Sequence, residues 1–180
     1  MHKVAEKILV SYTEIEKRTK ELGAELSKDY KDKEPIFVAI LKGSIPFFAL
    51  LMNYLDIDGM YTDFMDVKSY EGVNSTHDVK IRKDIETNVA DKDVVIVEDI
   101  VDTGYTLEKL ISILKSKGAR SVKVVTLLNK QERRIVDVKA DYVAFEIPNE
   151  FVIGFGLDYY DQLRQLPYVA VLKKEYYEKQ

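Results

Sequence analysis

A short segment between residues 94 and 107 gathers acidic, hydroxyl and glycine residues behind an apolar run. The run Val94–Val97 has the composition of a buried strand, and two adjacent carboxylates, Glu98 and Asp99, follow it. Adjacent carboxylates repel each other, and this repulsion is tolerable only where solvent, a cation or several hydroxyl donors lie beside them. The loop Asp102–Thr106 then opens into residues with helical spacing, and amide N–H groups at the start of a helix bind anions. This order predicts a sugar-phosphate site, in which carboxylates hold ribose hydroxyls and amides hold the 5′-phosphate.

An ordinary structural interpretation of the same segment competes with this one. A bare D-x-G-x-T pattern often occurs by chance, and it then marks a turn and an N-capped helix with solvated acids. Here the apolar strand, the acidic pair, two further apolar residues and the helix all occur in one order. Gly104 permits close approach of the backbone, and Thr103 and Thr106 add hydroxyl donors. The whole context therefore favours the functional interpretation.

The composition excludes several other kinds of site. The 180 residues include no cysteine and only two histidines, which excludes disulfides and thiolate metal sites and nearly excludes a histidine-based triad. Any metal would be held by carboxylates, which favours magnesium. A formal charge of −4 and a pI near 5.4 predict no broad nucleic-acid surface. No run approaches the ~20 apolar residues of a membrane span, and we expect a cytoplasmic protein without a secretory signal.

Apolar periodicity predicts alternating helices and strands. The segment Ser11–Glu14 has the form of a capping box, and helical spacing follows it as far as Tyr30. The predicted helices lie near residues 12–30, 45–55 and 107–118, and the predicted strands near 35–41, 61–69, 79–85, 93–97, 122–128, 142–147 and 168–172. This order is typical of an α/β fold with a mostly parallel twisted sheet flanked by helices. With no internal repeat or linker, residues 1–180 are expected to form a single domain.

The loops that follow Leu41, Val97 and Leu128 are expected to meet at one edge of the sheet. Ligands of such α/β sheets bind beyond the carboxyl ends of the strands. These loops carry Lys42 and Lys130 in addition to the acidic pair. A lone lysine just past a strand is usually solvated, so position alone assigns neither of them a role.

The segment 94–107 resembles the motif with which type I phosphoribosyltransferases bind phosphoribosyl pyrophosphate (PRPP). Further segments resemble the hypoxanthine-guanine branch of that family, in family order and across about residues 8–172: Leu41–Ser44, Lys68–Tyr70, Leu127–Lys130, Ile147–Tyr159 and Leu163–Tyr168. The resemblance implies a sheet with a small hood and lid, and Mg²⁺ as cofactor. It also implies purine salvage, in which the phosphoribosyl group of PRPP moves to N9 of hypoxanthine or guanine and yields IMP or GMP and pyrophosphate.

The resemblance assigns roles around PRPP to individual residues. Asp102 matches the catalytic acid or base that exchanges a proton with purine N7, and Glu98 and Asp99 match the pair that holds the ribose hydroxyls and a Mg²⁺ ion. Lys42 matches a pyrophosphate-binding lysine of the family. In the family, the peptide bond before this lysine, here Leu41–Lys42, is often a non-proline cis peptide. The full predicted set for PRPP and its phosphates is Lys42, Gly43, Glu98, Asp99, Asp102, Thr103, Gly104, Tyr105, Thr106 and Arg164.

The resemblance also assigns a purine site. Lys130 matches the donor to the purine 6-oxo group, which would reject adenine because its amino group is itself a donor. Phe151 matches the residue that stacks on the base, and Val152 the residue that offers backbone contacts. Asp158 matches the ligand of a second Mg²⁺ ion near the base edge. Taken alone, a phenylalanine of this kind is usually core and an aspartate a turn residue. The terminal segments would form the base-binding hood.

A polar segment over about residues 69–80 matches the flexible lid of the family. Ser69 and Tyr70 begin it, and its closure would exclude water and limit hydrolysis of PRPP. Ser75–His77 stands where relatives commonly have Ser-Thr-Gly, so the geometry of the lid is expected to differ. We interpret His77 as a solvated loop residue rather than a catalyst.

Two alternative functions remain open from the sequence. One is a xanthine-preferring or broader 6-oxopurine transferase, which contacts to the base 2-position would decide. The other is a regulatory RNA-binding protein on the same fold, against which the acidic pI and the set of catalytic residues argue. The resemblance implies a homodimer or homotetramer whose ligands are PRPP and a 6-oxopurine. Near the end of the chain, Tyr176, Tyr177 and Lys179 are expected to form a frayed surface tail.

Overall fold

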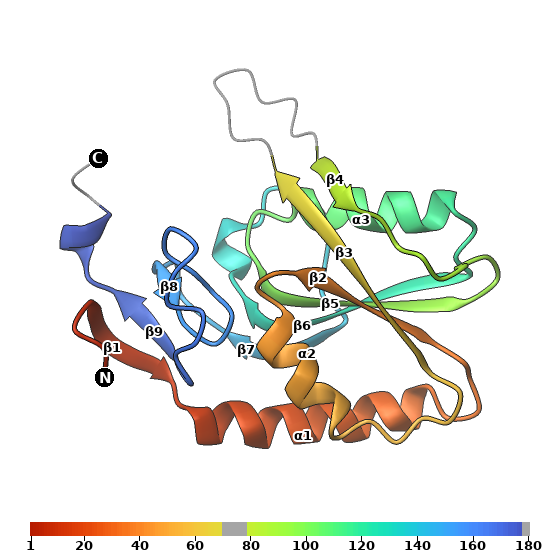
Figure 1. Cartoon of the computed structure of the whole chain (residues 1–180), viewed down its shortest axis with the longest axis horizontal. Coiled ribbons are helices and arrows are strands. Elements are labelled where there is room, and N and C mark those ends of the chain that lie inside the picture. Colours follow the sequence, from red (N-terminus) through yellow and green to blue (C-terminus); the bar gives the residue numbers. More distant parts are fainter. Residues whose placement is uncertain (70–78, 178–180) are drawn as a thin grey trace.

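The computed structural model of the protein describes residues 1–69 and 79–177, which form two sheets (Figure 1). The larger sheet has the strand order β4-β3-β2-β5-β6-β7. Its strands are β2 (Ile36–Leu41), β3 (Tyr61–Ser69), β4 (Val79–Lys83), β5 (Asp93–Val101), β6 (Ser121–Asn129) and β7 (Tyr142–Glu146). The β3–β4 pair is antiparallel and the other pairs are parallel, which confirms the predicted mostly parallel sheet.

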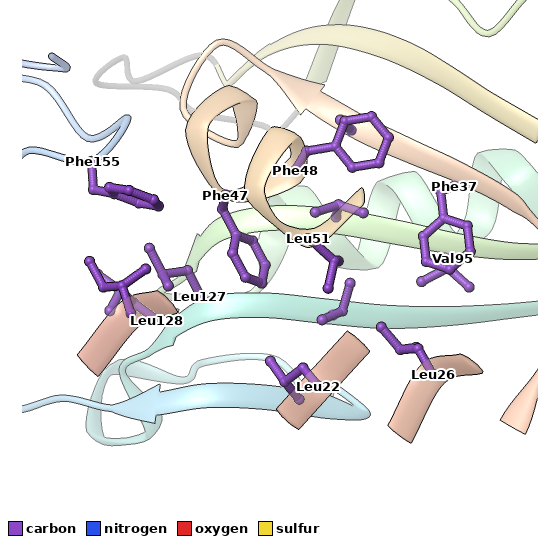
Figure 2. Close-up of a cluster of buried hydrophobic side chains, with 14 of the residues drawn as sticks. Leu22, Leu26, Phe37, Phe47, Phe48, Leu51, Val95, Leu127, Leu128 and Phe155 are labelled. Carbon is purple, nitrogen blue, oxygen red and sulfur yellow. The ribbon is translucent and has the colours of Figure 1, made fainter. Parts of the chain in front are cut away.

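Helices cover both faces of this sheet. Helices α1 (Tyr12–Asp29) and α2 (Ile45–Met52) lie on one face, and α3 (Tyr105–Ser116) lies on the other (Figure 1). Phe37 and Ala39 of β2 pack with α1 and α2, whereas Ile36 and Val38 pack with α3. Both faces of the strand are therefore apolar, which explains its continuous apolar run. Figure 2 shows the first cluster, in which side chains of α1 and α2 meet those of β2, β5 and β6.

The helix ends follow from local hydrogen bonds. The capping box is present, because Glu14 Oε2 accepts from the Ser11 amide at 2.8 Å and Ser11 Oγ accepts from the Glu14 amide at 3.4 Å. Helix α2 ends at Met52 rather than near residue 55, because the amides of Asn53 and Tyr54 bond to carbonyls three residues back and tighten the last turn. No helix within the described part of the chain is long and apolar enough to cross a membrane.

The smaller sheet joins segments from the two ends of the chain. It has the order β1-β9-β8 with antiparallel pairs, and its strands are β1 (Ala5–Val10), β8 (Val152–Ile153) and β9 (Val169–Leu172). Strands β1 and β8 were not predicted. We call residues 1–10 and 148–177 the hood, which lies beside the carboxyl ends of the large sheet (Figure 1).

The prediction of a frayed tail is wrong for Tyr176 and Tyr177. A 3-10 turn, η2 (Lys174–Tyr176), follows β9, and both tyrosines are half-buried against the hood core of Val4, Ala5, Ile153, Ala170 and Leu172. The Tyr159 hydroxyl also donates to the carbonyl oxygen of Tyr176. Apolar contact and hydrogen bonding therefore hold this segment in place. Lys179 lies outside the described residues.

The predicted hairpin next to the lid is confirmed. Strands β3 and β4 pair in antiparallel fashion, with Ser69 opposite Val79. Both ends of the segment assigned to the lid therefore belong to strands. Tyr70 and His77 fall outside the described residues.

Candidate active site

The direction of the sheet order reverses between β2 and β5. Strand β2 pairs with β3 on one side and with β5 on the other, so the loops after β2 and β5 leave the sheet in opposite directions and a crevice lies between them. The predicted cis peptide Leu41–Lys42 is present at the end of β2. A pocket of about 110 Å³ lies at the end of β5 and is lined by Glu98, Ile100, Val101, Asp102, Thr103, Gly104, Thr106 and Leu107.

The acidic pair lies within β5, which ends at Val101. The sequence-based prediction, which placed the pair beyond the end of this strand, is therefore wrong. Strand β6 continues to pair with β5 at Glu98, Ile100 and Val101, so the strand continues past the acids. Glu98 is 8% exposed, and burial together with the charge of Asp99 raises the pKa of its carboxyl well above the ordinary value. Burial also raises the pKa of Asp99 to about 6. Neither carboxylate forms an ion pair with any lysine or arginine of the described residues.

The chemistry of these two carboxylates fits Mg²⁺. Among residues 1–69 and 79–177 there is no cluster of three or more histidines or acids arranged to hold a metal. Magnesium is, however, usually bound through one or two carboxylates and completed by substrate phosphates and water. Glu98 and Asp99 offer adjacent oxygens that form no direct ion pair within the described residues, although the more distant charge of Arg164 lowers the pKa of Asp99, so the pair matches that requirement.

Asp99 packs directly against the loop that follows β2. A Cβ added to Gly43 would lie 1.6 Å from Asp99 Oδ2, so a larger residue would force the Asp99 carboxylate to move. A Cβ added to Gly156 of the hood would lie 1.8 Å from the Gly43 carbonyl oxygen. The residue-43 loop is therefore held between the acidic pair and the hood.

Charged residues of the loop and the hood form one cluster beside this contact. Lys42 Nζ lies 2.9 Å from Asp161 Oδ2. Arg164 Nη2 lies 2.8 Å from Asp158 Oδ1 and 2.9 Å from Asp161 Oδ1, and its Nη1 donates to the Gly156 carbonyl at 2.7 Å. The structure thus brings the predicted Lys42, Asp158 and Arg164 together. Asp161 was missed, although its spacing of three residues from Asp158 was a usable signal.

A second cluster surrounds Asp102. Arg133 Nε lies 3.0 Å from Asp102 Oδ1, and Lys130 Nζ lies 3.7 Å from Oδ2. Oδ1 is shielded from solvent yet accepts no hydrogen bond within the described part of the chain, because Arg133 lies outside hydrogen-bonding geometry. Lys130 is 6% exposed, and burial lowers the pKa of its ammonium group while Asp102 opposes that shift. The arrangement leaves an acceptor oxygen without its hydrogen bond beside a buried cation.

Arg134 fixes the backbone on which Asp102 stands. It follows the 3-10 turn η1 (Gln131–Arg133), and its guanidinium donates to the Asp102 carbonyl at 3.0 Å and to Asn129 Oδ1 at 2.5 Å. It also donates to the carbonyl oxygen of Val138. Sequence reasoning missed both Arg133 and Arg134, although they lie only three and four residues after Lys130.

The start of α3 matches the predicted phosphate cradle. Gly104 is the N-cap with φ of +92°, a left-handed conformation that favours glycine. The N-cap residue makes no side-chain hydrogen bond to this helix, and the first amides of a helix have no carbonyl partner within the helix and attract anions. Thr103, Tyr105 and Thr106 flank this turn, as predicted.

The predicted purine residues lie in the hood and directly after β6. Phe151 is 39% exposed just before β8, whereas Val152 is buried within β8 and pairs with Val171. Lys130 directly follows β6, and its amide donates to the carbonyl of Val101, the last residue of β5, at 3.0 Å. Of the predicted lid residues, Ser69 ends β3 and Tyr70 lies outside the described residues.

Comparison with known proteins finds relatives over nearly the whole chain. Residues 9–160 match the phosphoribosyl transferase domain family. The chain is 51% identical over 174 residues to a hypoxanthine-guanine phosphoribosyltransferase of Streptococcus mutans, which covers 96% of each chain. It is similar to the crystal structure of a hypoxanthine phosphoribosyltransferase from Staphylococcus aureus, with TM-score 0.94, 45% identity and coverage of 98% and 96%. A Trypanosoma cruzi hypoxanthine phosphoribosyltransferase, solved in complex with the product IMP, has TM-score 0.91, 38% identity and coverage of 98% and 99%.

Replacing Asp99 by asparagine should stabilise the ligand-free protein at neutral pH. The folded pKa of Asp99 is about 6, above its ordinary value of 3.8, so the folded state binds more protons and loses stability as pH rises between these values. Asparagine does not titrate. In thermal unfolding experiments without divalent cations, the Tm of the Asp99→Asn variant should therefore be higher than that of the wild-type protein. The difference in Tm should be larger at pH 7.5 than at pH 5.

The matched control for this experiment is Asp58→Asn, at an exposed aspartate away from the site. It should produce no difference in Tm that grows with pH. An Asp99→Asn variant that melts below the wild-type chain at pH 7.5 would contradict the electrostatic interpretation of the acidic pair.

Proposed function

The chain belongs to the hypoxanthine-guanine phosphoribosyltransferase family, and on this basis we propose that it transfers the phosphoribosyl group of PRPP to N9 of hypoxanthine or guanine. The products would be IMP or GMP and pyrophosphate. The named relatives support this activity, and so does the IMP bound by the Trypanosoma cruzi enzyme. We also propose a homodimer or homotetramer, which light scattering would test.

The observation that carries this proposal is the Oδ1 atom of Asp102. It is a buried carboxylate oxygen that accepts no hydrogen bond in the described structure, and its one close cation is Arg133, 3.0 Å away but outside hydrogen-bonding geometry. A donor from a ligand would satisfy this acceptor. In the proposed reaction, the N7–H group of the purine donates to it. Asp102 would take or share this proton as N9 forms its bond to ribose C1′.

The groups around PRPP would come from the ends of β2 and β5 and from the hood. Glu98 and Asp99 would hold the ribose hydroxyls, and the amides at the start of α3 would hold the 5′-phosphate. Mg²⁺ held by the acidic pair, and by Asp158, would neutralise charge on the pyrophosphate. Lys42 and Arg164 would bind the leaving pyrophosphate and stabilise its developing charge.

Ion pairs of the hood must rearrange for this binding. Lys42 and Arg164 are paired with Asp158 and Asp161 in the ligand-free structure. A pyrophosphate would take over these cations, and Asp158 would then be free to bind Mg²⁺. Exchange of one set of anions for another keeps both cations paired throughout, so giving up these partly exposed ion pairs costs little.

The purine would lie between the hood and the end of β6. Lys130 would donate to the 6-oxo group, Phe151 would stack on the ring, and the backbone of Val152 would meet the base edge. A buried ammonium group that faces the adenine amino group would lose its acceptor, which predicts selection for 6-oxopurines.

The direct test is nucleotide formation from Mg²⁺ and PRPP with hypoxanthine, guanine, xanthine and adenine in parallel. Turnover of the 6-oxo bases without adenine is expected, and the order among the three bases would define the subtype. PRPP binding without turnover of any base would overturn the proposal.

Replacing Lys130 by methionine should lower kcat/KM for hypoxanthine more than kcat/KM for adenine. Loss of a hydrogen bond to a charged donor costs about 1.5–3 kcal/mol, so kcat/KM should fall about 10- to 150-fold. The ratio of hypoxanthine to adenine turnover should narrow in steady-state assays, while the KM for PRPP should change little. An unchanged ratio would remove Lys130 from base discrimination.

Replacing Asp102 by asparagine should reduce kcat by about 100-fold or more, the usual range for loss of a general acid or base. The side chain keeps its size, so PRPP should still bind, as calorimetry would measure. Turnover at the wild-type rate would exclude Asp102 from proton transfer.

A further inference from the structure

One face of the Phe151 ring is already occupied in the ligand-free protein. The ring of Tyr177 stacks on it, with a centroid distance of 5.3 Å and an interplanar angle of 24°. The ring of Tyr159 meets it edge-on, at 6.0 Å and 87°. Phe151 is nevertheless 39% exposed, so part of the ring still faces outward. A stacked partner and an edge-on partner together restrict both torsions of this side chain.

Tyr177 is held in this position by the hood. Its amide donates to the Lys174 carbonyl at 3.1 Å, which closes the turn η2. The turn follows β9, and the Leu172 amide at the end of β9 donates to the Phe151 carbonyl at 2.8 Å. Phe151 directly precedes β8, Tyr177 follows β9 through η2, and β8 pairs with β9 in the small sheet. Backbone hydrogen bonds therefore bring the two segments that carry the stacked rings together.

We propose that Tyr177 is a positioning residue of the purine site, which fixes the plane of Phe151 and leaves one face of that ring for the base. This inference rests on the proposed function. A base that stacks on a ring already held in place does not have to restrict its rotation on binding, so affinity for the base increases. The effect should act on the purine and not on PRPP, because the predicted PRPP groups lie at the ends of β2 and β5, apart from Arg164. Within the described structure, that arginine forms its ion pairs and hydrogen bonds with Gly156 and two aspartates of the hood, and not with Phe151 or Tyr177.

The test compares the KM for hypoxanthine, the KM for PRPP and kcat in Tyr177→Ala, Tyr177→Phe and wild-type protein. Tyr177→Ala should raise the KM for hypoxanthine about 2- to 12-fold, the factor that corresponds to one aromatic pair. The KM for PRPP should stay within about 2-fold, because a general loss of structure would move both constants. Tyr177→Phe keeps the ring and should restore the wild-type value.

Two controls separate this role from a structural one. Tyr61→Ala removes an exposed tyrosine at the start of β3, away from the hood, and should change neither KM. In a double-mutant cycle, Tyr177→Ala should add little to the effect of Phe151→Ala, because Tyr177 acts through Phe151. Fully additive effects would overturn the proposal.

The remaining outcomes are also decisive. If Tyr177→Ala lowers the KM for hypoxanthine, the tyrosine competes with the base and does not position Phe151. If both KM values and kcat change together, the residue supports the hood alone. If wild-type protein forms no nucleotide, the proposed function fails as well. If the wild-type protein is active and Tyr177→Ala leaves the KM for hypoxanthine unchanged, only this inference is overturned and the proposed function stands.

Discussion

The pairing of β5 with β6 is the constraint on which the site depends. Because this ladder continues to Val101, it carries Glu98 and Asp99 into the sheet, where burial raises the pKa of both carboxyls. Charges held in this way destabilise the fold unless a cation or hydroxyl donors reach them. The carboxyl edge of the sheet therefore holds two carboxylates that need a cation and hydroxyl donors, and a magnesium-bound sugar phosphate supplies both.

The same edge is where the sheet and the hood meet. Gly43 lies between Asp99 and Gly156 of the hood, so the loop after β2 packs closely against both the acidic pair and the hood. Asp102 directly follows β5, and Arg134 links its carbonyl to Asn129 at the end of β6. The rigid sheet thus positions the groups proposed for PRPP and proton transfer, and the hood supplies the aromatic surface proposed for the base.

Local sequence patterns predicted the sheet and its helices well because these elements bury continuous or periodic apolar surface. They failed where pairing is non-local: β1 and β8 are short or largely exposed, and β9 from the far end of the chain pairs with both. The acidic pair was placed beyond β5 because adjacent charges usually mark a strand end. The roles of Arg133, Arg134 and Tyr177 depend on contacts across loops, which periodicity does not reveal.

The most direct test of the account is calorimetric binding of PRPP, with and without Mg²⁺, to wild-type protein and to the Glu98→Gln/Asp99→Asn double variant. The account predicts tight, magnesium-dependent binding to the wild-type protein, and weak binding to a folded double variant whether or not magnesium is present. Equally tight, magnesium-dependent binding to the double variant would contradict the claim that the buried acidic pair creates the PRPP site.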